Sequence, residues 1–320
     1  MKILVTGATG SLGSRLVEKW ASTREVTATG RKKFLGPTGV PFLPGDLADA
    51  AFVRNALKGQ EIVVHCAALA SAWGPWENFY RANVVATQNV VDACLANGVR
   101  QLIHISTPSV YFQQADRRGI RESDPLPPPA THYAKSKLMA DEIVASAKGL
   151  QTVMLRPRGI FGPTDQVILP KILRLLRKGR FPLVRGGRPL VDLTHVDNVI
   201  HAIERCVECG SAPGVSGEIF NISNGEPIAV KELVDLIAGQ LGLKVTMIPL
   251  PLAFTQTVAG AFELAYKITR AEGEPPLTKY GLGLLSYDQT LDLTKARERL
   301  GYKPPVGLRS GIKSTLEKLA

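Results

Sequence analysis

The sequence predicts an α/β protein, a doubly wound parallel (Rossmann) sheet with a smaller C-terminal lobe. Short runs rich in valine and isoleucine alternate with longer helical patterns in the first half of the chain, and this rhythm loosens after about residue 156. Alternating strands and helices build right-handed βαβ units, which assemble into one sheet covered by helices. The 320 residues are 45% hydrophobic and 21% charged, which is an ordinary globular composition.

The individual elements follow from local patterns. Some runs are apolar and bounded by turn residues, as buried parallel strands are, and these span residues 2–6, 26–29, 40–43, 61–66, 101–106 and 151–155. Helical periodicity between them predicts helices at 12–20, 50–57, 78–96 and 133–146. In the second half, which prolines interrupt, helices are expected at 198–208, 230–241, 249–276 and 311–319.

The net charge of +11 favours an anionic partner, which is nucleic acid, a membrane surface or an acidic small molecule. No nucleic-acid recognition motif accompanies the charge, so we expect no nucleic-acid partner. The excess lies in residues 31–33 and in seven Lys and Arg residues between 171 and 188. The second group predicts a basic amphipathic helix and loop that attract a carboxylate-bearing substrate or an anionic membrane, or that form only a solvated face.

Cysteine content bears on the compartment. Four cysteines in a chain of this length point to a reducing environment, and we expect a cytoplasmic protein. The apolar run at the start of the chain is too short for a signal-peptide core. Cys206 and Cys209 form a lone CxxC pair with no second pair of ligands near it in the sequence, so we predict no metal site.

A glycine-rich turn, GATGSLG at residues 7–13, follows the first expected strand and opens the first expected helix. Glycines there let the backbone turn tightly and let a diphosphate approach the amide groups of a helix N-terminus. The turn therefore predicts a dinucleotide site. Its candidate contacts are Gly7, Thr9, Gly10, Ser11, Leu12 and Gly13.

The end of the second expected strand distinguishes between cofactors. Folds that bind NAD usually place Asp or Glu near this point to bond the ribose 2′-hydroxyl, whereas this strand ends in GRKK at residues 30–33. Arg31 can bind a 2′-phosphate through charge-assisted hydrogen bonds, so the sequence predicts NADP (NADPH). After the third strand, Asp46 and Leu47 are expected at the adenine edge, with Asp46 contacting the amino group of the base.

Tyr133 and Lys137 lie four residues apart on one expected helix, so both side chains project from the same face. A phenol ordinarily has a pKa of about 10. A neighbouring ammonium group and the positive nicotinamide stabilise the phenolate, so we expect them to lower the pKa of Tyr133 toward the working pH. The segment STPSVY, residues 106–111, ends the fifth expected strand and adds hydroxyl groups.

The glycine turn, the STPSVY strand end and the Tyr133/Lys137 pair resemble the extended short-chain dehydrogenase/reductase family over essentially the whole chain. The resemblance implies that Tyr133 donates a proton, that Lys137 holds the nicotinamide ribose and tunes the tyrosine, and that Thr107 hydrogen-bonds the substrate carbonyl. Ser106 and Ser109 are the neighbouring alternatives to Thr107. The implied cofactor contacts in these later segments are Ala67, Ala68, Asn83, Tyr133, Lys137 and Pro157.

Within that family, LRPRGIFGP at 155–163, THVDNV at 194–199 and WGPW at 73–76 resemble the 3β-hydroxysteroid dehydrogenase branch. That branch includes bacterial reductases of long-chain 2-alkyl-3-keto acids and sterol dehydrogenases. Sugar-nucleotide epimerases and dehydratases, the rival reading, usually carry an arginine where this chain has Val191 before Asp192. A non-catalytic NADP-binding regulator usually lacks the tyrosine–lysine pair. The sequence thus favours an oxidoreductase.

We therefore expect an NADPH-dependent enzyme that reduces the ketone, or oxidises the secondary alcohol, of an apolar lipid-like or steroid-like small molecule, with a long-chain 3-keto acid as one candidate. Residues 1–165, with 190–210 returning to them, are expected to form the NADP-binding domain, and 166–320 the substrate-binding lobe. Trp73 and Trp76 are expected beside the substrate mouth, and His195 is expected to be structural. The helix over 247–266 is a candidate for peripheral membrane contact. The helices at 78–96 and 133–146 are candidates for a homodimer interface.

Overall fold

The computed structural model of the protein describes residues 1–165, 168–210, 212–269, 271 and 273–319. Its centre is a parallel sheet with the strand order β12-β7-β5-β4-β1-β2-β3. The strands are β1 (Lys2–Thr6), β2 (Glu25–Gly30), β3 (Phe42–Pro44), β4 (Ile62–His65), β5 (Gln101–Ile105), β7 (Gln151–Pro157) and β12 (Glu218–Ile222). Strands β4 and β5 are buried along their whole length, which explains the apolar residues that make up most of each strand.

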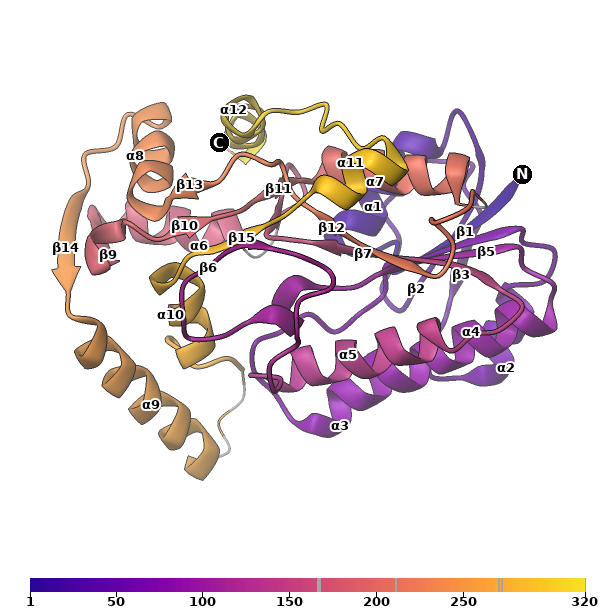
Figure 1. The fold of residues 1–320 in the computed structure, drawn as a ribbon, viewed down its shortest axis with the longest axis horizontal. Coiled ribbons are helices and arrows are strands. Elements are labelled where there is room, and N and C mark those ends of the chain that lie inside the picture. Colours follow the sequence, from indigo (N-terminus) through magenta and orange to yellow (C-terminus); the bar gives the residue numbers. More distant parts are fainter. Residues whose placement is uncertain (166–167, 211, 270, 272, 320) are drawn as a thin grey trace.

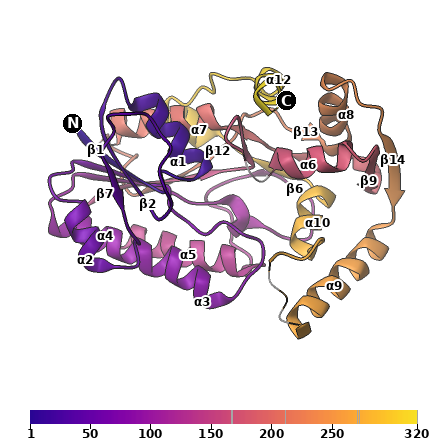
Figure 2. The same ribbon diagram turned by 180° about the vertical axis from the view of Figure 1, so that it is seen from behind.

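Helices cover both faces of this sheet (Figures 1 and 2), so the predicted doubly wound fold is confirmed. One layer contains α2 (Ala50–Ala56), α3 (Trp76–Phe79), a π-helical segment (Tyr80–Val85), α4 (Ala86–Ala96) and α5 (His132–Ala145). The opposite layer contains α1 (Ser11–Trp20), α7 (Val196–Cys209) and α11 (Thr294–Leu300). Within this second layer α7 packs against both α1 and α11.

Outside the central sheet the chain forms smaller sheets and further helices, most of them in the second half of the sequence. The added strands are β6 (Arg117–Ile120), β8 (Ile160–Phe161), β9 (Arg180–Val184), β10 (Leu190–Val191), β11 (Thr194–His195), β13 (Ile228–Ala229), β14 (Thr246–Leu250) and β15 (Gln289–Leu291). The added helices are α6 (Ile168–Leu176), α8 (Val230–Gln240), α9 (Leu252–Thr269), α10 (Lys279–Ser286) and α12 (Leu308–Leu319), with short 3₁₀ turns at Pro108–Tyr111 and Arg185–Gly187. Figure 1 shows α9 and α10 beneath the smaller sheets, at the end away from β3.

The structure adds a strand that the sequence patterns did not identify. Strand β12 pairs in parallel with β7 and forms one edge of the central sheet. Its sequence, EIFNI, has the same pattern as QLIHI of β5, so the local pattern could have identified this strand too. Residues 218–222 therefore lie in the central sheet, outside the range 1–165 and 190–210 expected for the first domain.

The helix expected over residues 249–276 begins later and ends earlier than predicted. Thr246–Leu250 is strand β14, which pairs with β9, and α9 spans Leu252–Thr269. Pro249 and Pro251 have no amide hydrogen, and the residue before a proline avoids the helical conformation. A helix therefore starts only beyond Pro251.

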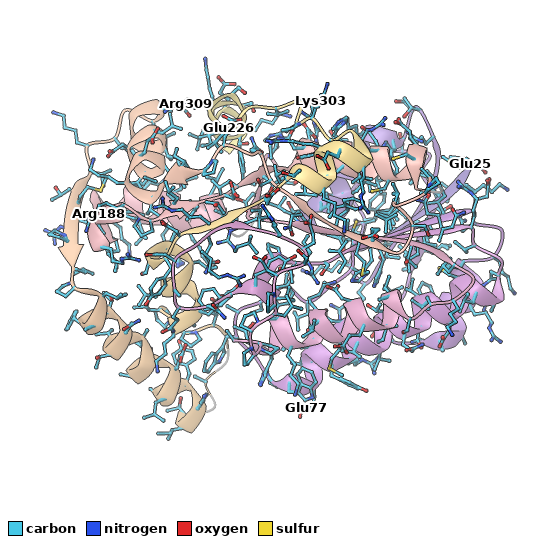
Figure 3. The ribbon with its side chains drawn as sticks, in the orientation of Figure 1. Glu25, Glu77, Arg188, Glu226, Lys303 and Arg309 are labelled. Atoms are coloured by element: carbon cyan, nitrogen blue, oxygen red, sulfur yellow. The ribbon has the colours of Figure 1, made fainter. Side chains whose placement is uncertain are left out.

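The basic helix predicted after residue 170 is present as α6. Leu169, Leu173 and Leu176 are buried, while Lys171 and Arg174 on the opposite side are exposed. Charged residues elsewhere, such as Glu25, Glu77 and Arg188, also lie at the periphery (Figure 3). Within the described residues, no helix combines the length and apolar character needed to cross a bilayer.

Candidate active site

The carboxyl ends of the parallel strands meet at one edge of the sheet, which is where open α/β folds bind their ligands. The predicted site residues follow successive strands at this edge. Gly7 follows β1, Arg31 follows β2, Asp46 follows β3, Ala67 follows β4, Thr107 follows β5 and Pro157 ends β7. The sheet order therefore gathers residues that are far apart in the sequence.

The glycine turn is so tight that it excludes side chains at two of its positions. Gly7 has a φ of 66°, and a Cβ there would lie 2.7 Å from the backbone of Ala67. A Cβ on Gly13 would lie 2.3 Å from the carbonyl oxygen of Gly7. Gly10 is the N-cap of α1 and offers no capping side chain, so the first amide groups of the helix are free to bind an anion. The turn fits the diphosphate of a dinucleotide.

The side chains of Thr9, Ser11 and Leu12 in this turn contact other parts of the protein. Ser11 Oγ lies 3.1 Å from the hydroxyl of Thr164, and the Leu12 side chain is buried in the core. Thr9 lies against Gly30, because a Cβ built on that glycine would be 3.1 Å from the Thr9 hydroxyl. For Ser11 and Leu12, the part free to meet a phosphate is therefore the backbone amide.

Arg31 is exposed at the end of β2, and none of the described residues forms an ion pair with it. Its charge contributes to holding the pKa of Asp46 below the usual value, although the amide of Ala48 and the guanidinium of Arg81 have larger effects. Those two groups lie 3.0 Å from the Asp46 carboxylate. The Leu47 side chain is buried. Arg31 is thus free to meet an added phosphate, and Asp46 is already held in place.

Asn83 holds a loop in the structure, and its predicted contact with the cofactor stays a prediction. Its Oδ1 accepts from the amide of Leu69 at 2.7 Å, and its Nδ2 donates to the Ser136 hydroxyl at 2.8 Å. The side chain is buried within the π-helical segment, a kind of distortion often found at functional sites. It ties the loop after β4 to α5 and so positions Ala67 and Ala68, of which Ala68 is exposed.

Thr107 and Tyr133 come together at the carboxyl end of β5. A hydrogen bond with Thr107 acts on the phenol of Tyr133. Thr107 Oγ1 also donates to Ser109 Oγ at 2.9 Å, and Ser109 Oγ lies 2.7 Å from the hydroxyl of Tyr280. Ser106 points away and donates to the carboxylate of Asp141 at 2.7 Å. Of the three candidate hydroxyl groups, Thr107 is the one placed at the tyrosine.

The groups of the protein alone do not lower the pKa of Tyr133, and the expected effect of the nicotinamide stays a prediction. Burial raises the pKa of Tyr133 to about 12, and the hydrogen bond with Thr107 offsets only part of that effect. Lys137 does not approach the phenol, because its ammonium group bonds the carbonyl oxygen of Ile105 and the ring of His104 instead. Spacing placed both side chains on one helix face, but it did not reveal how deeply the phenol is buried.

Lys137 belongs to a buried polar network beneath the site. Its Nζ lies 2.9 Å from Nε2 of His104, and burial lowers its pKa to about 8. Burial also holds the pKa of His104 well below its usual value, so the imidazole is neutral. Asp141, one turn along α5, accepts from Arg156 at 2.8 Å and adds a negative charge that favours the charged form of Lys137.

The sequence analysis did not identify His104, Asp141 or Arg156 as site residues. Two signals were available. His104 and Arg156 are polar residues inside the apolar strands β5 and β7, and Asp141 lies four residues after Lys137 on the same helix. A buried polar residue in a strand needs a partner, and in this fold the partners meet under the site.

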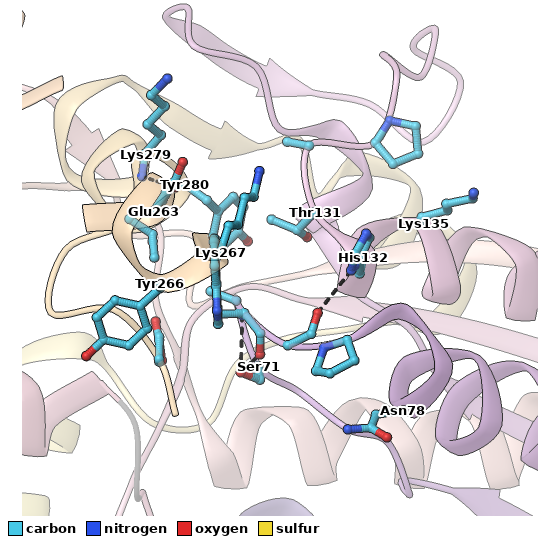
Figure 4. Close-up of a pocket in the computed structure, with 18 of the residues that line it drawn as sticks. Ser71, Asn78, Thr131, His132, Lys135, Glu263, Tyr266, Lys267, Lys279 and Tyr280 are labelled. Atoms are coloured by element: carbon cyan, nitrogen blue, oxygen red, sulfur yellow. Dashed lines mark hydrogen bonds between the residues drawn. The ribbon is translucent and has the colours of Figure 1, made fainter. Parts of the chain in front are cut away.

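A cavity of about 1200 Å³ (Figure 4) has Tyr280 in its wall, and the hydroxyl of Tyr280 connects it to Ser109 at 2.7 Å. One wall comes from the loop after β4 and the start of α5, and the other from α9 and α10. The wall residues include Trp73, Thr131, His132, Tyr266 and Tyr280.

The two tryptophans expected at the substrate mouth differ in position. Trp73 lines the cavity. Trp76 packs outside it against His132, with ring centroids 5.8 Å apart, and under the ammonium group of Lys135. His195 caps α7 by accepting from the amide of Asp197 at 3.2 Å, which is a structural contact.

Comparisons with known proteins identify the family. Residues 3–223 match the NAD dependent epimerase/dehydratase family. The chain is 35% identical over 328 residues to the 2-alkyl-3-oxoalkanoate reductase of Stenotrophomonas maltophilia (strain K279a), with 98% of each chain covered. It is 29% identical over 328 residues to the sterol-4-alpha-carboxylate 3-dehydrogenase, decarboxylating, of Mus musculus, covering 99% of this chain and 90% of that relative.

A solved structure agrees with this fold. MoeE5 in complex with UDP-glucuronic acid and NAD superposes with a TM-score of 0.78 at 26% identity, covering 100% of this chain and 99% of that chain. The glycine turn, the Thr107–Tyr133 contact and these relatives agree with one another. The chain belongs to the NAD-dependent epimerase/dehydratase family of extended short-chain dehydrogenases/reductases, on the 3β-hydroxysteroid dehydrogenase-like branch, and is an NAD(P)-dependent oxidoreductase.

Proposed function

We propose that the protein uses NADPH to reduce the ketone of an apolar, lipid-like or steroid-like substrate, and that the same groups act in the reverse oxidation of the alcohol. One observation carries the proposal: the Tyr133 phenol and the Thr107 hydroxyl interact at the sheet edge that also holds the glycine turn. The relatives named above, an oxoalkanoate reductase and a sterol dehydrogenase, support a lipid-like substrate.

The reaction follows from what the two hydroxyl groups can do. Thr107 and Tyr133 hydrogen-bond the carbonyl oxygen, and NADPH supplies the hydride that adds to the carbonyl carbon. Tyr133 donates its proton to the developing alkoxide. A pKa of about 12 keeps the phenol protonated at neutral pH, as a proton donor must be. Lys137, whose ammonium group bonds His104 and the carbonyl oxygen of Ile105, would hold the nicotinamide ribose.

Residues of the chain would hold the cofactor as follows. The amide groups at the start of α1 would bind the diphosphate, and Arg31 the 2′-phosphate, helped by Lys32 and Lys33. Asp46 and Leu47 would contact the adenine, while Ala67, Ala68 and Pro157 would line the rest of the site. The preference for NADPH rests on the free guanidinium of Arg31 and the absence of a carboxylate in residues 30–33.

The test is Tyr133→Phe, with Tyr80→Phe, an exposed tyrosine on the same side of the sheet, as the matched control. NADPH oxidation is measured with long-chain 3-oxo acids, steroids and simple ketones. We expect the wild type and the control to reduce at least one class, and Tyr133→Phe to lose roughly 100-fold to 10,000-fold of that rate. An unchanged rate in Tyr133→Phe would refute the assignment of the proton donor.

A sugar nucleotide is the second candidate substrate, because MoeE5 binds UDP-glucuronic acid. The residue before the buried Asp192 argues against a sugar nucleotide, because Val191 has no charge with which to bind a diphosphate. Turnover of UDP-sugars with tightly retained NAD and no added reductant, together with inactivity on every ketone, would favour this candidate over the reductase.

We further propose a substrate-binding role for the smaller lobe, a homodimer and a cytoplasmic location. The lobe contributes α9 and α10 to the cavity wall. Helices α4 and α5 pack side by side on one face of the sheet, and Leu95 on α4 is an exposed apolar residue there, which supports a dimer interface. The four cysteines are unpaired, which supports a reducing compartment. Light scattering on the purified protein tests the dimer.

A further inference from the structure

Arg158 has no role in the site as described so far. It follows β7 directly, at the sheet edge that carries Thr107. Its backbone is fixed on both sides, because its amide donates to the carbonyl oxygen of Ile222 at 3.0 Å and its carbonyl oxygen accepts from the hydroxyl of Thr194. The residue is only 8% exposed. The fold therefore holds a guanidinium group inside the protein at the active edge.

That guanidinium has no partner. Nε of Arg158 is buried without an acceptor, and in the described part of the chain no hydrogen bond or ion pair reaches its guanidinium. Arg156, two residues earlier, also has an unpartnered Nε, but its other two nitrogens are paired: it donates to the Asp141 carboxylate at 2.8 Å and to the Tyr111 hydroxyl at 2.6 Å. Burying an unpaired positive charge is unfavourable, so an anionic ligand is the expected counterpart.

Asp192, the carboxylate whose charge acts on Arg158, does not supply that counterpart. Asp192 favours the charged form of Arg158, but it forms no ion pair with any of the described residues. Its Oδ2 accepts from the amide of Leu291 at 2.6 Å, and burial raises its pKa to about 6. Burial accordingly outweighs Asp192 and lowers the pKa of Arg158 below its usual value.

An electrostatic interaction followed by two hydroxyl contacts relates Arg158 to the catalytic hydroxyl groups. The charge of Arg158 acts on Tyr280, whose hydroxyl lies 2.7 Å from Ser109 Oγ. Ser109 accepts from Thr107, and Thr107 interacts with the phenol of Tyr133. Tyr280 also lines the cavity. The unpaired charge thus adjoins the residue that connects the cavity to the site of proton transfer.

We propose that Arg158 binds a carboxylate of the substrate and so selects a β-keto acid, or the corresponding β-hydroxy acid, over a neutral ketone or alcohol. This inference rests on the proposed reductase function and names the substrate class of that same site. A guanidinium group can bind a carboxylate through two parallel hydrogen bonds. In a β-keto acid only one carbon separates the carboxylate from the ketone, so a carboxylate held at Arg158 fixes the ketone near Thr107 and Tyr133.

The experiment compares a carboxylic acid with its uncharged methyl ester. Because β-keto acids lose carbon dioxide in solution, the stable reverse substrates are used: a long-chain 3-hydroxy acid and its methyl ester, each oxidised with NADP⁺. Arg158→Gln is expected to lower kcat/KM for the acid roughly 10-fold to 150-fold, the usual value of a charge-assisted hydrogen bond, and to leave the ester within about threefold of wild type. Arg158→Lys recovers part of the loss. Arg54→Gln, an exposed arginine on α2, changes neither.

The alternative outcomes separate the two proposals. An equal fall for acid and ester, or no fall for the acid, overturns the carboxylate site while the reductase stands. If the wild type oxidises neither alcohol, calorimetric binding of tetradecanoate tests Arg158 directly, and the ketone panel described above decides the reductase proposal separately. Binding by the wild type that is lost in Arg158→Gln supports the carboxylate site. UDP binding that depends on Arg158, without tetradecanoate binding, overturns it in favour of a phosphate.

Discussion

Nζ of Lys137 lies 2.9 Å from Nε2 of His104, in a region where both side chains are buried. An ammonium group only donates, and the imidazole is neutral because burial lowers the pKa of His104 well below its usual value. Nε2 is therefore the acceptor, and the ring proton is on Nδ1, which has no partner among the described atoms. His104 thus acts as a positioning residue for Lys137.

We predict that His104→Leu destabilises the protein by about 1.5–3 kcal/mol, the value of a hydrogen bond to a charged group. The loss of this acceptor also lowers the pKa of Lys137 further below about 8, so any limb of the pH profile of kcat/KM that reports this lysine moves to lower pH. His104→Gln retains an acceptor oxygen and recovers part of both effects. If His104→Leu keeps the stability and the pH profile of the wild type, His104 does not position Lys137.

Arg31 is predicted to select NADPH. Arg31→Ala removes charge-assisted hydrogen bonds to the 2′-phosphate, and we expect kcat/KM for NADPH to fall roughly 10-fold to 150-fold. The value for NADH, which lacks that phosphate, stays within about twofold. Arg54→Ala, on the exposed side of α2, is the matched control. Equal losses with both cofactors would mean that Arg31 does not recognise the phosphate.

Asp192 gives the protein a defined pH dependence of stability. Burial raises the pKa of its carboxyl group from 3.8 to about 6 in the folded protein. Between roughly pH 4 and 6 the folded state keeps a proton that the unfolded state has released, so the free energy of unfolding falls as the pH rises through this window. About 2 pKa units correspond to about 3 kcal/mol.

Asp192→Asn removes this ionisation and keeps an acceptor for the amide of Leu291. We expect the variant to gain stability relative to the wild type as the pH rises from 4 to 6, and the difference in unfolding free energy to stay constant above pH 6. Urea unfolding at a series of pH values measures this difference. Asp235→Asn, an exposed control, shows no such gain. A flat difference between wild type and Asp192→Asn would contradict the raised pKa.

Helix α9 is predicted to bind membrane surfaces. Phe254, Leu264 and Ile268 are more than half exposed, at 59%, 59% and 72%, and their helical spacing puts them on one side of α9. Exposed apolar side chains on a helix favour insertion at the lipid interface. We expect the protein to sediment with anionic vesicles of phosphatidylglycerol and phosphatidylcholine. The variant with serine at all three positions (Phe254→Ser, Leu264→Ser and Ile268→Ser) is expected to remain in the supernatant.

A second comparison separates this apolar contact from simple charge attraction. Lys171→Gln combined with Arg174→Gln lowers the basic charge of α6 and leaves α9 intact. If this variant loses vesicle binding and the triple serine variant does not, the basic face of α6 is responsible. If the wild type does not sediment with the vesicles at all, the membrane contact is excluded.

The positions of the central strands and of the glycine turn could be predicted because they depend on local patterns. Apolar runs such as that of β4 identify strands buried on both faces, and β12, whose EIFNI has the same pattern as QLIHI of β5, could have been identified in the same way. Gly7 and Gly13 were predictable because the tight turn leaves no room for a side chain at either position. The four-residue spacing of Tyr133 and Lys137 likewise fixed their common helix face.

The raised pKa of Tyr133, the acceptor of Lys137 and the isolation of Arg158 could not be predicted in this way. His104 and Lys137 are 33 residues apart, and their contact exists because α5 packs beside β5. The isolation of Arg158 depends on the distance to every acidic group around it. Local sequence patterns encode neither the packing of α5 beside β5 nor the distances around Arg158.

By itself the sequence determined the doubly wound sheet, the cofactor turn and the residues at its active edge, because hydrophobic periodicity, glycine geometry and helical spacing act between neighbours in the chain. Only the tertiary structure decided which hydroxyl group lies at Tyr133, what pairs with Lys137 and which arginine stays unpaired. These properties depend on burial and on distances between residues far apart in sequence, and both are set only when the helices pack against the sheet.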